Sequence, residues 1–434
     1  MIDLPGDPEE GSPPVSTTTA TAIPYTTAPR PPLELVPVAE NPRGLCPPAY
    51  RDRILVYTVH DGTTIPSFVL DNPAIAPLEA RGELWPLYVR ERDWGANLVA
   101  ETLAYTLGLP GYYRVNVARV VLDFNRFPGS SAPEATPLDR MAVLHPFSAL
   151  LSHQEKRRLL EEHYDPISEG MERALGNNLL FMAVHTYDQH NATQTQRPEI
   201  SLLTRALSYQ QASRLPYNTF DPLFPDILAE SSAHPILRDR VALTLEKAGL
   251  DVEHNYPYCL PDGSLEVRSQ PWLFFQAVRR LFLETHPETT DDPAFDLVWK
   301  MLLNTNLRVA DAEALSGYLR RFRRPPLGQE SRFEAAALAY DTVCTFLGDR
   351  SDFICNYRRS PNRTSALAVE IRKDLVWRFE DGEPIAGRPR NAEAIASTLA
   401  SGIAEYFECD HQNSQDDVAS SWSSSPENKL TSAS

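Results

Sequence analysis

Two apolar segments of the chain are each followed directly by a histidine. Residues 54–59 precede His60, and residues 178–184 precede His185. Their length and their apolar content are typical of strands that are buried within a sheet. In an open α/β sheet the carboxyl ends of the strands form the crevice where ligands bind, so we expect both imidazoles on one rim. Together the two histidines suggest a metal site.

Strand-like and helix-like segments alternate between residues 48 and 410. The strand-like ones are residues 54–59, 115–122 and 179–184, and a helix is expected from Ala96 to Leu107, ending at Gly108. Such alternation predicts an α/β fold with a mixed, mostly parallel sheet flanked by helices.

The composition changes at both ends of the chain and in one internal segment. Residues 1–47 are rich in Pro and Thr, residues 411–434 are rich in Ser, and both are expected to be disordered. Residues 48–410 then form the α/β domain. Apolar residues recur at helical spacing over about 271–352 without clusters of ligand-type side chains. We expect a helical insertion there that packs on the sheet or covers the crevice.

Charge and hydropathy exclude two classes of partner. The formal net charge of -17 argues against nucleic-acid binding, which needs clustered Lys and Arg. No apolar run approaches the roughly 20 residues of a membrane-spanning helix, and the first residues lack the pattern of a signal peptide. We therefore expect a cytoplasmic protein that binds neither nucleic acid nor membrane. The sequence does not indicate the oligomeric state.

Several polar side chains at the ends of these segments could act in a site. Asp93 either caps the helix from Ala96 or offers an oxygen to a metal. Asn125 and Arg126 follow a strand-like run and suit a carboxylate ligand, since a guanidinium can bind it through two hydrogen bonds. His190 supplies a rival ligand near His185.

The order of these elements resembles the N-formylglutamate amidohydrolase family. The family's HxGxxIP, DxGA and DxNR motifs match residues 60–66, 93–96 and 123–126, with similar spacing. Further matches are the histidine-bearing strand and the RPDISL-type, N-x-PY and LEIRRDL-type elements, at residues 183–187, 197–202, 255–258 and 369–375. The resemblance covers about residues 53–407, interrupted by the helical insertion, and implies a zinc-peptidase-like, phosphorylase/hydrolase-like fold.

The resemblance also implies the residues of a site. Zn²⁺ would be held by His60, Asp93 and His185, and Glu370 would act as general base. The implied substrate-binding residues are Asn125, Arg126 and Arg197. The implied reaction is the zinc-dependent removal of a formyl-like acyl group from a small carboxylate-bearing amino acid.

Three alternatives remain open from the sequence. A competing alignment replaces Glu370 by Gln276, which would put an amide at the position of the base. The chain could be a catalytically idle binding or regulatory protein on the same fold. It could also be an amidase that acts on a peptide or peptidoglycan.

Overall fold

A single seven-stranded sheet organises the protein. The structure is a computed structural model, which describes residues 24–136, 139–176, 178–191, 193–210 and 220–410. The strands lie in the order β1-β3-β2-β4-β7-β5-β6. Their bounds are β1 Leu33–Pro37, β2 Ile54–Thr58, β3 Gly111–Val115, β4 Leu180–Tyr187, β5 Ile200–Leu203, β6 Val252–His254 and β7 Ser365–Arg372. Four of the six pairings are parallel, which confirms the predicted mixed, mostly parallel α/β sheet.

Helices cover both faces of the sheet. One face packs against α5 (Ala96–Leu107), α11 (Pro235–Lys247) and α18 (Pro389–Glu405). The other face packs against α4 (Leu84–Glu91), α8 (Asp165–Leu175) and the first residues of α12 (Leu265–Thr285). Because both faces are buried, β2, β4 and β7 have no exposed residue, as expected of parallel strands.

Shorter elements connect these layers. They are α1 Pro48–Arg51, α2 Ser67–Leu70, α3 Ala76–Ala80, α6 Phe147–Leu150, α7 His153–Leu159, α9 Leu207–Gln210, α10 Asp226–Ala229, α17 Lys373–Val376 and the hairpin of β8 Trp377–Glu380 and β9 Glu383–Gly387. Helix α7 begins with a capping box, in which Ser152 and Glu155 bind each other's backbone amides.

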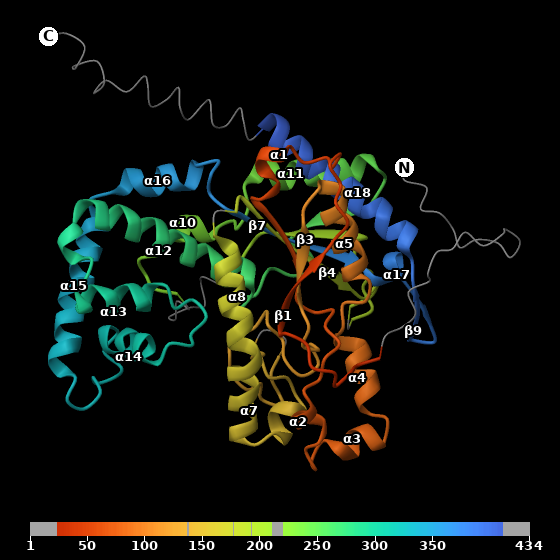
Figure 1. The fold of residues 1–434 in the computed structure, drawn as a ribbon, viewed down its shortest axis with the longest axis horizontal. Helices are drawn as coiled ribbons and strands as arrows, with labels where there is room; N and C mark the ends of the chain where they lie inside the picture. The colour runs from red at the N-terminus through yellow and green to blue at the C-terminus, as the bar shows by residue number, and fades with distance from the viewer. Residues whose placement is uncertain (1–23, 137–138, 177, 192, 211–219, 411–434) are drawn as a thin grey trace, which may run out of the picture.

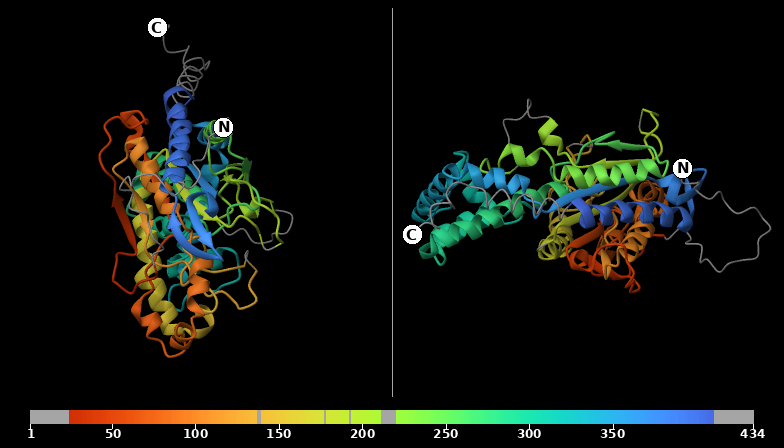
Figure 2. Two further views of the ribbon diagram at one scale, coloured as in Figure 1. Left: turned by 90° about the vertical axis from the view of Figure 1, so that its right-hand side faces the viewer. Right: turned by 90° about the horizontal axis from the view of Figure 1, so that it is seen from above.

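The helices that follow Pro271 form a lobe beside the sheet, which we call the helical lobe (residues 271–359). It contains the second half of α12, α13 (Pro293–Leu302), α14 (Ala310–Leu319), α15 (Glu330–Gly348) and α16 (Ser351–Arg359). Figures 1 and 2 show it extending to one side of the sheet. It has a separate apolar core of aliphatic and aromatic side chains, among them Phe274, Phe282 and Trp299.

The leader predicted over residues 1–47 is partly wrong. Within it, β1 pairs antiparallel with β3 at the edge of the sheet, from Leu33 opposite Val115 to Pro37 opposite Gly111. This pairing uses main-chain groups, so a Pro- and Thr-rich composition does not reveal it. Residues 1–23 and the tail predicted over residues 411–434 lie outside the described residues.

Two strand predictions also need correction. The strand expected at residues 115–122 is wrong, because β3 ends at Val115 and the next residues form a loop. This loop makes isolated bridges, from Val117 to Thr64 and from Leu122 to Val143, and its apolar side chains are buried without sheet pairing. In addition, His185 lies inside β4 rather than after it.

None of the described helices is long and apolar enough to cross a membrane.

We predict that Phe282→Ala destabilises the protein by roughly 3–5 kcal/mol, because it removes a large side chain from a close-packed core. The Phe282 ring is fully buried, with its centroid 5.0 Å from that of Phe346 and 5.4 Å from that of Phe295. Urea unfolding measures the change. The matched control is Phe322→Ala, since Phe322 is 67% exposed and should be neutral. Equal midpoints for the two variants would contradict the packing described here.

Candidate metal and hydrolase site

The end of β2 brings His60 to the rim of the sheet. His60 follows β2 by two residues, and its carbonyl oxygen accepts a hydrogen bond from Asp93 N at 3.1 Å. The next turn must contain a glycine, because a Cβ on Gly62 would lie 2.4 Å from Val117 O. The loop that follows β3 is thus packed directly against the loop that carries His60.

Three potential metal ligands meet at this rim. One ligand atom from each of His60, Asp93 and His185 lies within 4.8 Å of the other two, and all three residues are buried. Asp93 Oδ2 lies 3.0 Å from His185 Nδ1 and 3.4 Å from His60 Nδ1. The alternative role of Asp93 as a helix cap is wrong, because Gly95 is the N-cap of α5 and no side chain caps it.

The other nitrogen of each ring faces a different polar group. His60 Nε2 lies 2.9 Å from Asp123 Oδ1. His185 Nε2 lies 3.5 Å from Asn125 Nδ2 and 3.9 Å from Glu266 Oε1. Such outer contacts fix the orientation of an imidazole, so that both Nδ1 atoms are directed toward Asp93.

The donor set fits a divalent metal. His60 Nδ1 is buried and makes no hydrogen bond within the described residues. Two imidazole nitrogens and a carboxylate oxygen are a ligand set used for catalytic zinc, with a further position left open. His60, Asp93 and His185 can therefore hold a metal.

The charges of the buried residues also favour a metal ion at this position. Burial lowers the pKa of His185, but the carboxylates of Asp93 and Glu266 outweigh it and hold the pKa well above its ordinary value. Asp93 behaves in the opposite way: burial raises its pKa, and the nearby His60 and His185 hold it below the usual range. The buried carboxylates of Asp93 and Glu266 thus favour a positive charge at His185, which a metal ion could supply in place of a proton.

Glu370 lies next to His185, one of the three potential ligands. It occupies β7 directly opposite His185 of β4, and Tyr258 Oη donates a hydrogen bond to Glu370 Oε1 at 2.5 Å. Burial raises the pKa of Glu370, although His185 opposes this. Its rival Gln276 belongs to α12 and does not line the same cavity. His190 is exposed and lies apart from the group of ligands.

A cavity of about 470 Å³ opens above these residues, and we call it the catalytic cavity. His60, Asp93, His185 and Glu370 line it, as do Asn125, Arg126 and Arg197. Arg126 Nε lies 3.7 Å from Asp123 Oδ2, and burial lowers the pKa of Arg126. The guanidinium of Arg197 lies over the ring of Tyr187, 5.2 Å from its centroid. No described residue of the helical lobe lines this cavity.

Two polar contacts of the site are not evident from the sequence. Asp123 belongs to the DxNR motif, but the motif does not indicate that its carboxylate contacts His60. Glu266 is fully buried at the start of α12, where Tyr57 Oη donates to its Oε1 at 2.7 Å. Its only sequence signal is a charged residue beside the apolar Leu265 and Val267, which does not identify a partner 209 residues away.

Comparison with protein families identifies the class of protein. The family model described as N-formylglutamate amidohydrolase matches residues 52–269, just over half of the 434 residues. The chain belongs to the N-formylglutamate amidohydrolase family. The matched segment contains His60, Asp93 and His185 and ends before Glu370.

Other comparisons are less specific. No curated protein matches the chain. Among solved structures, a gene product from Agrobacterium tumefaciens is 16% identical, with a TM-score of 0.39, and the match covers 86% of this chain and 93% of that one. An N-formylglutamate amidohydrolase from Ralstonia eutropha JMP134 is 15% identical, with a TM-score of 0.45, and the match covers 87% of this chain and 99% of that one.

We predict that Asp123→Asn weakens divalent-metal binding roughly 10- to 100-fold, because the carboxylate that orients His60 is lost. Competition with a chromophoric chelator measures the affinity. Asp139→Asn is the matched control, since Asp139 is exposed and bonds only to the nearby Thr136 among the described residues. An unchanged affinity in Asp123→Asn would mean that this contact does not support a metal ligand.

Proposed function

We propose that the protein is a zinc-dependent amide hydrolase that removes a formyl-like acyl group from the nitrogen of a carboxylate-bearing amino acid. The observation that carries this proposal is the convergence of His60, Asp93 and His185 in one cavity with Glu370 and Arg126. Membership of an amidohydrolase family supports the reaction class.

His60, Asp93 and His185 would hold the zinc ion. When bound, zinc lowers the pKa of a coordinated water from 15.7 toward about 7 and polarises a carbonyl group. The protein contributes the shape and charge of the site: Asp123 orients His60, while Asn125 and Glu266 face the far side of His185.

Glu370 is the residue placed to move the proton. Its carboxylate accepts the proton of the attacking water and returns it to the leaving amine, a role that contributes roughly 10²- to 10⁴-fold to a rate. Tyr258 Oη donates to Glu370 Oε1, which fixes that oxygen and leaves Oε2 for the water. The register opposite His185 keeps this carboxylate beside the metal ligands.

The cationic and amide groups of the catalytic cavity would bind the substrate. Arg126 can pair with the α-carboxylate through two hydrogen bonds, with Asn125 beside it, and Arg197 adds positive charge on another wall. Holding the carboxylate would fix the scissile amide over the metal, which lowers the entropic part of the barrier.

The volume of the cavity favours a small substrate over a long chain. About 470 Å³ falls within the usual range of small-molecule pockets, roughly 300 to 1,000 Å³. The reading as an idle binding protein is less favoured, because burying Asp93, Glu266 and Glu370 together is costly unless a cation balances them.

The proposal is tested by comparing His185→Ala with Glu370→Gln. We expect His185→Ala to lose most of the bound zinc and the activity, since it lacks a ligand. We expect Glu370→Gln to keep its zinc and lose at least about 100-fold in kcat, since only the proton transfer is removed. Elemental analysis and hydrolysis of N-formylglutamate are the measurements. Wild-type protein that neither contains nor takes up zinc would refute the proposal, and full activity in Glu370→Gln would refute the role of this residue.

Arg126→Ala should discriminate between substrates. Loss of the guanidinium should reduce kcat/KM for N-formyl amino acids roughly 10- to 100-fold, since charge-assisted hydrogen bonds contribute about 1.5–3 kcal/mol. Substrates whose carboxylate is amidated should be affected much less. Arg158→Ala is the control, because Arg158 lies on the exposed surface of α7. Equal losses for both substrate types would identify Arg126 as a structural residue.

A further inference from the structure

A second cavity lies where the helical lobe meets the sheet, at the start of β7, whereas the catalytic cavity is lined by Ala368 and Glu370 further along the same strand. Its volume is about 420 Å³. The end of β5, the start of α11, the end of α16 and the start of β7 form its walls. We call it the arginine cavity, after the side chains Arg205, Arg238, Arg358, Arg359 and Arg363. It shares no lining residue with the catalytic cavity.

The arginine cavity has an excess of positive charge, although the chain has a net charge of -17. Glu230 is the only acidic residue among the described residues that line it, and it pairs with Arg358 at 2.9 Å. Arg238 pairs with its exposed neighbour Asp239. Among the described residues, Arg205, Arg359 and Arg363 form no ion pair. Three cations of this cavity thus have no anionic partner in the part of the chain that the structure describes.

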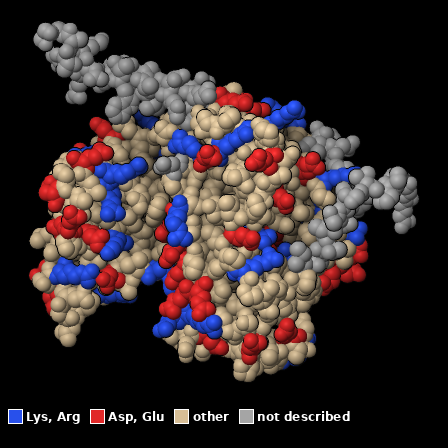
Figure 3. Space-filling model, in the orientation of Figure 1, with Lys and Arg blue, Asp and Glu red and all other residues tan. Residues whose placement is uncertain are grey.

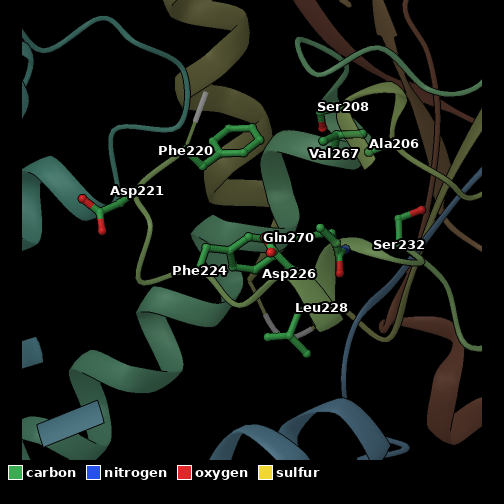
Figure 4. Close-up of a pocket in the computed structure, with 11 residues that line it drawn as sticks. Ala206, Ser208, Phe220, Asp221, Phe224, Asp226, Leu228, Ser232, Val267 and Gln270 are labelled. Carbon is green, nitrogen blue, oxygen red and sulfur yellow. The ribbon is translucent and has the colours of Figure 1, made fainter. Parts of the chain in front are cut away.

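Arg363 is held in place by uncharged acceptors. Its Nη2 donates to Leu228 O at 3.0 Å, Ser231 O at 2.9 Å and Gln270 Oε1 at 2.9 Å. Leu228 and Gln270 also line a smaller, mostly apolar cavity of about 80 Å³, which is shown in Figure 4. Neutral carbonyls orient the guanidinium without cancelling its charge, so the positive charge remains available to a ligand.

Neutral donors lie beside the arginines. Asn255 Oδ1 accepts hydrogen bonds from Thr204 N and Arg205 N, both at 2.9 Å, which leaves the amide NH₂ of Asn255 as a donor. The 13-residue helix α11 begins at Pro235 in the same wall, and its dipole adds positive potential. In Figure 3, Lys and Arg side chains are visible on the upper surface, over α16 and α11.

We propose that the arginine cavity binds a small molecule that carries a phosphate group. Guanidinium groups bind phosphate oxygens through paired hydrogen bonds, and the three arginines that form no ion pair with a described residue can together balance a group with two negative charges. The volume suits a small molecule and not a folded partner. Ile227 and Ile236, each 43% exposed, line the same cavity and provide an apolar surface for the rest of the ligand. This site is independent of the proposed hydrolase reaction.

The test is calorimetric titration of the full-length protein with inorganic pyrophosphate at constant ionic strength. The variant Arg205→Gln/Arg359→Gln removes two guanidinium groups that have no ion pair. We expect it to weaken binding at least tenfold, because each charge-assisted hydrogen bond lost is worth about a factor of ten. Arg157→Gln/Arg158→Gln is the control, with the same change of charge on the distant helix α7, and should leave binding unchanged.

A further variant, His185→Ala/Arg126→Ala, distinguishes pyrophosphate binding in the arginine cavity from binding in the catalytic cavity. The proposal requires that this variant still binds pyrophosphate with the wild-type affinity. Arg359→Gln alone, at an exposed position, provides a second measurement that does not depend on the double variant. Three results would each overturn the proposal. They are pyrophosphate binding no stronger than that of a chloride control, equal weakening of binding in the α7 control variant, and loss of binding in His185→Ala/Arg126→Ala.

Discussion

The parallel pairing of β2, β4 and β7 is the constraint on which the site depends. Pairing in one direction brings the carboxyl ends of these strands to the same rim, where His60 follows β2 and His185 lies opposite Glu370. Burial of both faces of the sheet then restricts how these polar side chains can be satisfied. They can face only one another or the cavity, because an unpaired polar group in an apolar core is costly. The fold therefore concentrates charge at this rim.

Around that rim, positive and negative side chains alternate in an inner layer around Asp93 and an outer layer around Asp123. Asp93 lies between the two histidines, and Asp123 lies between His60 and the guanidinium groups of Arg119 and Arg126. A bound cation would complete the inner layer, and under the proposed function the arginines of the outer layer would bind the carboxylate of the substrate. The arginine cavity differs from this rim, because several of its arginines have no carboxylate partner among the described residues of an acidic protein.

The sequence was sufficient to predict elements that have local signals. Elements that depend on residues far away in the chain were not predicted. Helix α5 was predicted over its observed length, because Gly108 ends it and its apolar residues share one face. The strand at residues 115–122 was wrong, since apolar residues buried in a loop have the same composition as a strand. β1 was missed because it depends on main-chain pairing with β3 at the edge of the sheet. The potential metal ligands His60, Asp93 and His185 belong to short motifs, so the sequence could identify them as candidates.

The sequence by itself determined the chemical groups of the site and the α/β class, because periodicity and motifs are properties of neighbouring residues. Only the tertiary structure decided which groups meet. It brought Glu266 from the start of α12 and Tyr57 from β2 into a hydrogen bond, and it put Asp123 behind His60. It also formed the arginine cavity from four separate segments. The physical reason is that long-range contacts are selected by the packing of whole layers, which local sequence does not encode.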